Sequence, residues 1–180
     1  MKAIIFTDLD ASLLHEETFS CSEIIDTLKS LISSGVLIVP NTSKTEVETR
    51  NVLKSLGLRT SFVIENGAKL CDIHQTFQSI CETDKEFGIE MSELNIRLEK
   101  LGDPSFANNF QPINELKRKY ASQILGLTGS ELEEALERQY SRLYRYIGPK
   151  SKIPRWQEAL LKVGLNLSQG GRVFAVSGCH

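Results

Sequence analysis

The sequence has 180 residues, 41% hydrophobic and 24% charged, which is typical of a soluble globular protein with one ordinary domain or two small ones. A net charge of -2 is not the charge of a nucleic-acid-binding chain, and no apolar run reaches the ~20 residues of a membrane helix. The opening segment does not have the pattern of a signal peptide, so we expect a cytoplasmic protein. The four cysteines lack CxxC spacing and are expected to be reduced thiols; they are Cys21, Cys71, Cys81 and Cys179.

The first eighty residues alternate between apolar runs and segments with helical periodicity. A hairpin is expected around Asn66-Gly67, the strongest short-range hairpin signal. The alternation predicts an α/β fold whose parallel sheet has right-handed crossovers. The expected elements are a strand over 2–8, a helix over 21–35, a strand over 36–42, a helix over 43–58, and a strand, turn and strand over 61–73.

The second half of the chain has a different pattern, which predicts an α+β module. We place the boundary near residues 82–86, giving an α/β core over 1–83 and the module over 84–180. We expect helices over 91–102, 112–127 and 153–165, a helix that becomes extended over 128–148, and a strand pair around Gly170-Gly171 over 166–178.

Polar residues follow the expected strands of the first half at the points where those strands end. Functional groups in parallel sheets gather at the carboxyl ends of the strands. The residues at these ends are Asp8, Asp10, Thr42, Ser43, Glu65 and Asn66.

The first of these groups, "FTDLDASLL" at residues 6–14, carries two aspartates one residue apart. One carboxylate could attack a phosphate ester, and the second could act as general acid and then as base. Mg²⁺ prefers oxygen ligands and would screen the charges of carboxylate and phosphate. A bare DxD pattern is more often only a solvated strand end.

The second group, "NTSK" at residues 41–44, ends one strand and opens a helix. Hydroxyl groups and helical N–H groups at such a position bind anions, and Lys44 adds a positive charge. Taken alone, such a segment is more often a plain helix cap. The two groups together, at adjacent strand ends, favour a phosphate site.

Three motifs, in their order and spacing, resemble those of the haloacid dehalogenase superfamily of phosphatases: "FTDLDASLL", "VPNTSKTEVE" and "FVIENGA". "TSKT" and "ENGA" are similar to its mannosyl-3-phosphoglycerate phosphatase branch, as are "LTGSELEEALERQYS" and "GLNLSQGGRVFAVSG" in the second half. The resemblance covers most of the chain. It implies a Rossmann-like core with a cap domain, and a magnesium-dependent phosphatase that acts on a sugar phosphate through an aspartyl-phosphate intermediate.

The resemblance also implies roles for matching residues. Asp8 would be the nucleophile and a metal ligand, and Asp10 the acid/base that gives its backbone carbonyl to Mg²⁺. Thr42 would hold the transferred phosphoryl group, with Ser43 and Lys44 beside it. Substrate contacts are expected from Glu65 and Asn66 and, in the cap, from Arg138, Gln139, Ser141, Gly170, Gly171 and Arg172.

Composition independently favours an anionic ligand in the cap. Residues 138–172 contain eight basic side chains and one acidic one, Glu158. A sugar phosphate that carries a carboxylate would be attracted by such a surface. The alternative is a solvated basic face or a weak nucleic-acid patch.

The sequence departs from the family pattern at three places. Ala11-Ser12 replaces Gly-Thr after the second aspartate, and Ala is poorly suited to a position with positive φ. Val173, Phe174 and Ala175 replace aromatic residues and His after "GGR". The family's bracing Lys and metal-completing acids are also missing, since no Lys, Asp or Glu follows Arg172, and "LGDPSFANN" at 101–109 matches the acidic loop only by chance.

Three hypotheses follow. The first is a phosphatase whose core is partial and whose activity is impaired by C-terminal truncation. The second is a module that binds a phosphate or sugar phosphate without turnover. The third is an interaction protein, because a partial sheet leaves an apolar edge and face that favour a homodimer.

Overall fold

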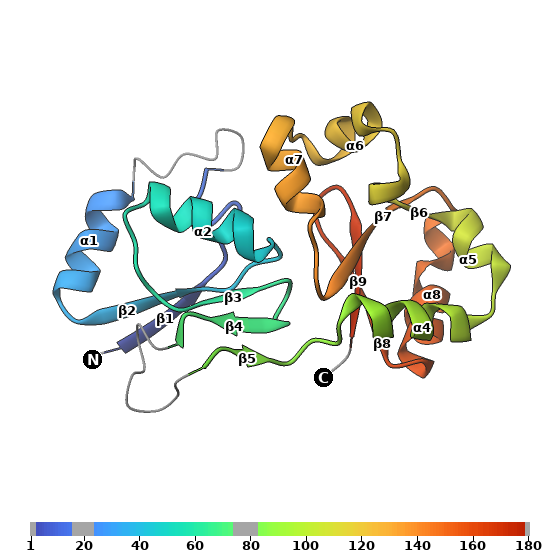
Figure 1. Ribbon diagram of the computed structural model, residues 1–180, viewed down its shortest axis with the longest axis horizontal. Helices are drawn as coiled ribbons and strands as arrows, with labels where there is room; N and C mark the ends of the chain where they lie inside the picture. The colour runs from blue at the N-terminus through green and yellow to red at the C-terminus, as the bar shows by residue number, and fades with distance from the viewer. Residues whose placement is uncertain (1–2, 16–23, 74–82, 179–180) are drawn as a thin grey trace. The chain divides into compact units, whose positions relative to one another are not determined.

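The structure is a computed structural model that describes residues 3–15, 24–73 and 83–178 (Figure 1). The chain divides into two compact units, Met1–Phe87 and Gly88–His180. The α/β fold predicted from the sequence is confirmed, with a parallel strand pair in the first unit and antiparallel sheets beside it and in the second unit. Among the described residues, no helix is long and apolar enough to cross a membrane.

The first unit is built on a parallel strand pair, with each strand running toward the same edge. β1 (Ala3–Thr7) and β2 (Val36–Pro40) pair in register from Ala3 opposite Val36 to Thr7 opposite Pro40. A parallel bridge between Asn41 and Val63 joins the end of β2 to the third strand. The remaining strands form an antiparallel meander: β3 (Phe62–Ile64), β4 (Lys69–Cys71) and β5 (Lys85–Glu86).

Two helices cover one face of these strands, α1 (Ile25–Ser33) and α2 (Glu46–Ser55) (Figure 1). Both fall inside the segments predicted as helices, and the predicted N-terminal residues 21–23 of the first lie outside the described ranges. α2 begins with a capping box, in which Thr45 Oγ1 accepts from Glu48 N–H and Thr45 N–H donates to the Glu48 carboxylate. This cap fixes where the helix starts, directly after the "NTSK" segment.

β1 exposes apolar side chains, as the sequence predicts for a partial sheet. Ile4, Ile5 and Phe6 are 37%, 39% and 64% exposed. Consecutive strand residues point to opposite faces, so apolar surface is exposed on both sides of β1. Within the described part of the chain, β2 is the only strand that pairs with β1.

The cysteine that the structure describes, Cys71 in β4, is a free and completely buried thiol. Burial raises its pKa to about 12, so the reactive thiolate is scarce at neutral pH. This agrees with the expectation of reduced cysteines. Cys21, Cys81 and Cys179 lie outside the described residues.

The second unit is a four-stranded antiparallel sheet in the order β6-β7-β9-β8. Its strands alternate their contacts between two cores. Tyr144 packs with Trp156 and Phe110, while its neighbour Leu143 packs with the cluster of Ile113 and Leu132. The strands are β6 (Phe110–Pro112), β7 (Ser141–Tyr146), β8 (Leu165–Gln169) and β9 (Phe174–Gly178).

Helices supply the other halves of both cores. The helices are α4 (Met91–Leu101), α5 (Pro104–Asn109), α6 (Arg118–Leu125), α7 (Gly129–Leu136) and α8 (Ile153–Lys162), with 3₁₀ turns η1 (Ile113–Glu115) and η2 (Lys150–Lys152). α4 and α8 contribute Leu94, Trp156 and Leu160 to the first core, and α6 and α7 contribute Ala121 and Leu132 to the second.

One predicted element is wrong in its first part. The sequence predicts a helix over 112–127, but Pro112 ends strand β6, which pairs with β7, and the helix α6 starts at Arg118. Pro has no N–H to donate, yet it is tolerated at a strand end. The segment 101–109, which resembles an acidic metal-binding loop in sequence, contains the N-cap and helix of α5. The Asp103 side chain accepts from Ser105 N–H and caps this helix, which supports the interpretation that the match is accidental.

Candidate phosphoryl-transfer site

The two aspartates of the DxD word lie in the turn that follows β1. The Asp8 side chain is exposed and its Oδ1 accepts from Leu9 N–H at 2.7 Å, while Leu9 itself is completely buried. Burial of Leu9 therefore anchors the turn and leaves the carboxylates on either side near the surface. Apart from the Leu9 bond, Asp8 has no side-chain partner among the described residues.

The turn closes tightly through Ala11. Leu14 N–H donates to Leu9 C=O at 2.8 Å, and Ala11 has a φ of 53°, in the left-handed region. The Cβ atom of an L-residue crowds the following carbonyl in this conformation, which costs about 1–2 kcal/mol. The departure from glycine noted in the sequence is thus a strained position.

We expect Ala11→Gly to raise the free energy of unfolding by about 0.5–1 kcal/mol, because relief of the left-handed strain exceeds the entropy gained by the unfolded chain. Urea unfolding of both forms measures the difference. The control is Ala68→Gly, at a buried position with an ordinary φ, which should lose stability. A loss of stability in Ala11→Gly would contradict the assignment of strain.

Backbone hydrogen bonds hold the Thr42–Lys44 loop between the neighbouring strand ends. Asn41 N–H donates to Thr7 C=O, and Thr42 N–H donates to Val63 C=O at 3.0 Å. Asn66 N–H returns a bond to Thr42 C=O, also at 3.0 Å. The loop is thus fixed on both sides before any ligand arrives.

Thr42 presents a hydroxyl donor at this edge. The residue is 2% exposed, and its Oγ1 accepts from Lys44 N–H at 3.2 Å. A hydroxyl that accepts can also donate one proton, and no acceptor for that proton is found among the described residues. A buried donor of this kind, next to the N-terminus of α2, suits an anion such as phosphate. Ser43 is exposed on the same loop.

Lys44 joins the two strand ends. Its Nζ lies 3.1 Å from Asp10 Oδ1 and 3.9 Å from the Glu48 carboxylate. The contact confirms that the segments holding the DxD and "NTSK" words meet at one edge of the sheet. Asp10 Oδ1 is shielded from solvent and, within the described ranges, accepts no well-aligned hydrogen bond, so the ion pair leaves it incompletely satisfied.

Glu65 and Asn66 directly follow β3, the third strand whose carboxyl end borders the site. Both have positive φ, 45° and 60°, at the start of the loop between β3 and β4, and Glu65 N–H donates to Lys44 C=O at 3.0 Å. Glu65 is 1% exposed, whereas Asn66 is exposed. Both predicted residues therefore lie beside the Thr42–Lys44 loop, and of the two only Asn66 presents a side chain to solvent.

Asp8 has an open carboxylate oxygen of the kind that Mg²⁺ prefers, whereas Asp10 Oδ1 lies against the Lys44 ammonium group. The fit is loose, since the described residues contain no group of three or more His, Cys, Asp or Glu that could hold a metal ion. Water would have to fill most of an octahedral shell.

The predicted cap residues fall into two local groups in the second unit. At the start of β7, Arg138 Nε donates to the completely buried Ser141 Oγ at 2.8 Å, with Gln139 between them in the chain. In the turn between β8 and β9, Gly170 N–H donates to Val173 C=O. Arg172 in that turn donates through Nη1 to Leu125 C=O at 3.4 Å.

A family model described as "haloacid dehalogenase-like hydrolase" matches residues 5–87, which include every residue of the edge described above. This part of the chain is therefore similar to the haloacid dehalogenase-like hydrolases. The match extends from β1 through β5, so it contains the DxD turn, the Thr42–Lys44 loop and the Glu65-Asn66 loop.

Similar curated proteins match nearly the whole chain. A glucosyl-3-phosphoglycerate/mannosyl-3-phosphoglycerate phosphatase of Persephonella marina is 28% identical over 97% of this chain and 66% of its own length. A mannosyl-3-phosphoglycerate phosphatase of Pyrococcus horikoshii is 29% identical over 99% of this chain and 72% of its own length. The chain therefore spans about two thirds to three quarters of these relatives.

Solved structures show the same fold. A haloacid dehalogenase-like hydrolase of Bacillus subtilis superposes with a TM-score of 0.62 at 19% identity, covering 99% of this chain and 73% of its own. The sucrose-phosphatase of Synechocystis, solved with sucrose and phosphate, superposes with a TM-score of 0.56 at 14% identity, covering 98% and 63%. The haloacid dehalogenase-like architecture thus extends into the second unit.

Sequence reasoning missed Glu48 as a member of the site. The predicted helix over 43–58 contains Glu48 without a role, while the structure places its carboxylate near Lys44 and in the α2 cap. The signal that could have found it is the spacing "TEVE" at 45–48, a capping box directly after the basic residue. Glu48 shares Lys44 with Asp10 and limits where that cation can point.

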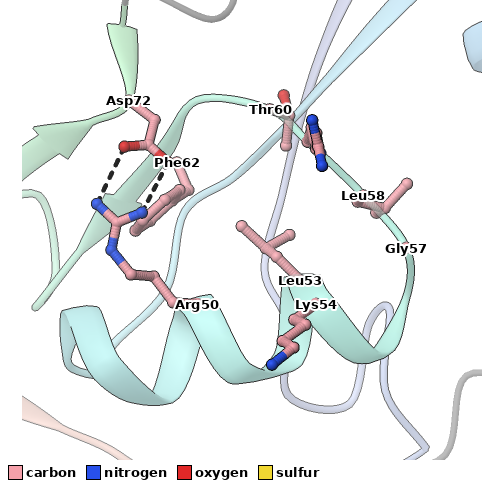
Figure 2. A pocket seen from close by; sticks show the side chains of 9 residues that line it. Arg50, Leu53, Lys54, Gly57, Leu58, Thr60, Phe62 and Asp72 are labelled. Carbon is pink, nitrogen blue, oxygen red and sulfur yellow. Dashed lines mark hydrogen bonds and ion pairs between the residues drawn. The ribbon is translucent and has the colours of Figure 1, made fainter.

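A hollow of about 440 Å³ lies beside the C-terminal half of α2, away from the capped end that borders the site (Figure 2). Arg50 and Asp72 close one side of it through two hydrogen bonds of 2.8 and 3.0 Å, and Arg50 lies over the Phe62 ring at 5.1 Å. The bonds to Asp72 hold the pKa of Arg50 above its usual value. The pair reads as a structural tie between helix and sheet.

Glu46 accepts hydrogen bonds from Arg50 and Lys69, and its ionisation should therefore make the stability of the fold depend on pH. Burial tends to raise the pKa of Glu46, but hydrogen bonds from Arg50 and Lys69 outweigh it and lower the pKa below 4.5. A carboxyl with a lowered folded-state pKa stabilises the fold above its unfolded pKa and loses that contribution as the pH falls. We expect Glu46→Gln to cost about 1 kcal/mol at pH 7 and little at pH 3, measured by urea unfolding. An equal cost at both pH values would contradict this.

Proposed function

We propose that this chain carries the phosphoryl-transfer site of a magnesium-dependent phosphomonoesterase. The observation that supports it is the meeting of Asp10 and Lys44, 3.1 Å apart, next to the buried hydroxyl donor of Thr42. Nucleophile, acid and anion donors are the parts that phosphoester cleavage needs. Relatives named for mannosyl- and glucosyl-3-phosphoglycerate favour a sugar phosphate of that kind as substrate.

In this proposal the substrate phosphate binds against Thr42 and the N-terminus of α2. An Asp8 carboxylate oxygen attacks phosphorus as the bond to the ester oxygen breaks, and Asp10 gives a proton to that departing oxygen, which for a 3-phosphoglycerate belongs to the glycerate. Asp10 then takes a proton from the water that attacks the aspartyl phosphate, which releases inorganic phosphate and restores Asp8. Bound Mg²⁺, held by the oxygens of Asp8 and Asp10, would offset negative charge during both transfers.

The ion pair between Lys44 and Asp10 suggests how the site responds to a ligand. Lys44 contacts the carboxylates of Asp10 and Glu48. A phosphate dianion carries more charge than a carboxylate and competes for the ammonium group. Lys44 then turns toward the phosphate, and Asp10 is freed to exchange protons.

In the second unit, we propose that Arg138, Gln139 and Ser141 at the start of β7, and the turn of Gly170, Gly171 and Arg172, contact the substrate's sugar acid. The support is the basic excess of residues 138–172 and the likeness of these segments to the curated relatives. Loss of these contacts should weaken sugar-phosphate binding more than binding of a small aryl phosphate.

The test of the function is hydrolysis of nitrophenyl phosphate by the purified chain with Mg²⁺ and with a chelator. We expect slow turnover that needs Mg²⁺, because the described residues contain no group of three or more His, Cys, Asp or Glu that could hold a metal ion, and each preorganised charge is worth ~10²–10³ in rate. The sparse ligand set also favours a second candidate, a phosphate-binding module without turnover. Phosphate binding without any hydrolysis would favour that module.

We further propose that a second copy of the chain covers β1. The support is the exposure of Ile4, Ile5 and Phe6 and the β1 edge opposite β2, which has no strand partner in the described part of the chain. Two identical strands can pair about a twofold axis, and burying apolar area is worth roughly 25 cal/mol per Å².

Sedimentation at micromolar concentration should therefore give twice the chain mass, and Phe6→Ser should shift the species to the monomer. Ile147→Ser, at a residue 47% exposed in the second unit, is the matched control and should leave the mass unchanged. A stable monomer that unfolds cooperatively would contradict the dimer.

A further inference from the structure

A hollow of about 460 Å³ in the second unit lies where the ends of β7 and β8, the start of β9 and the start of α8 come together. Its volume is within the range of small-ligand sites. Tyr146, Phe174 and two isoleucines give it an apolar wall, and the two rings pack edge to face with centroids 5.7 Å apart. The polar part of the lining consists of Arg145, Lys150, Gln169 and Arg172.

The charge of this hollow is unbalanced. Three of its lining side chains are cationic and none is a carboxylate. Elsewhere in the same unit, Arg97, Arg118 and Arg155 each pair with an acidic side chain. Within the described ranges, no ion pair involves Arg145, Lys150 or Arg172. Like charges around one cavity repel each other, and a bound anion would relieve that repulsion.

Arg172 is held at the edge of the hollow by the end of α6. Gly126 caps this helix with a φ of 73°, and a Cβ atom there would collide with the Arg172 guanidinium group. The guanidinium donates to Leu125 C=O, one of the last carbonyls of the helix, where the helix dipole favours a cation. The absence of a side chain at Gly126 thus makes room for the cation.

We propose that this hollow binds a phosphate-bearing small molecule, with the phosphate on Arg145, Lys150 and Arg172 and the organic part against Tyr146 and Phe174. Guanidinium groups bind phosphate through paired hydrogen bonds, and the three cations balance the charge of a phosphate dianion better than they balance that of a single carboxylate. The inference assigns Arg145 and Lys150 to ligand binding, which the proposed function does not use. It holds whether or not the first unit hydrolyses esters.

The test is an NMR titration of the full chain with 3-phosphoglycerate and, separately, inorganic phosphate, without Mg²⁺. Amide signals of Lys150 and Phe174 report on the hollow, and those of Thr42 and Asn66 report on the first unit, so the two sites are read apart. We expect saturable shifts at the hollow, tighter for 3-phosphoglycerate. Arg145→Gln and Lys150→Gln should each weaken binding about fivefold to tenfold. Lys162→Gln, the same charge change at the far end of α8, should not.

Gly126→Ala provides a second variant with a matched control. It should displace Arg172 and weaken binding at the hollow. Gly102→Ala places the same strain on another helix end, at a φ of 63°, where the nearest neighbour of the new atom is a backbone oxygen at 3.8 Å. It should lose similar stability but keep its affinity. Unshifted hollow signals at saturating probe, or equal weakening by Lys162→Gln and Lys150→Gln, would overturn the inference.

Discussion

Asp8→Asn should lower magnesium-dependent hydrolysis of nitrophenyl phosphate by at least about 10⁴-fold, because an amide cannot attack phosphorus and covalent nucleophiles cost that much or more when removed. Asp8 is exposed, with Leu9 N–H as the partner of its side chain in the described structure, so the amide can occupy the same place. Stability should change little. Initial rates under saturating ester and millimolar Mg²⁺ give the ratio.

Asp26→Asn is the matched control for this variant. Asp26 is exposed in the first turn of α1, and the substitution makes the same chemical change away from the sheet edge. It should leave the rate within about twofold of the parent, since surface substitutions away from a site have small effects. Comparable rates for the parent and Asp8→Asn would remove Asp8 from the chemistry.

Lys44→Met should lower kcat/KM by about 10²–10³, the usual cost of one preorganised charge at a reacting group. The Lys44 side chain is 14% exposed and lies 3.1 Å from Asp10, so Met can fill its volume but leaves the carboxylate without a cation. Phosphate binding, followed by calorimetry, should weaken in parallel. Urea unfolding separates this effect from loss of the fold.

Lys54→Met, on the exposed surface of the same helix, is the control and should leave turnover and phosphate binding unchanged. A variant at Lys44 that keeps phosphate affinity while losing turnover would mean that Lys44 acts only through Asp10. A variant with full turnover would contradict its place in the site.

The meeting of the segments that hold Asp10 and Lys44 could be predicted because it follows from topology. Parallel strands bring their carboxyl ends to one edge, so the residues after β1, β2 and β3 are neighbours whatever their side chains. The ion pair between Lys44 and Asp10 and the bond from Asn66 N–H to Thr42 C=O are the direct consequences.

Other features could not be predicted because tertiary contacts decide them. Residues 112–127 carry a helical pattern, but Phe110–Pro112 pair with β7, and the helix begins only at Arg118. Ala11 gives no sequence signal of a left-handed conformation beyond its departure from glycine, and the buried Leu9 imposes the turn.

The most direct test of the central claim, that Asp8 receives the phosphoryl group, uses beryllofluoride, which mimics a phosphoryl group on a carboxylate. Fluorine NMR of the purified chain with millimolar Mg²⁺ should show a bound resonance. The resonance should vanish in Asp8→Asn and persist in Asp10→Asn, because Asp10 moves protons and does not bond to the phosphoryl group. A bound resonance that survives Asp8→Asn, or none in the parent chain at saturating beryllofluoride, would contradict the account.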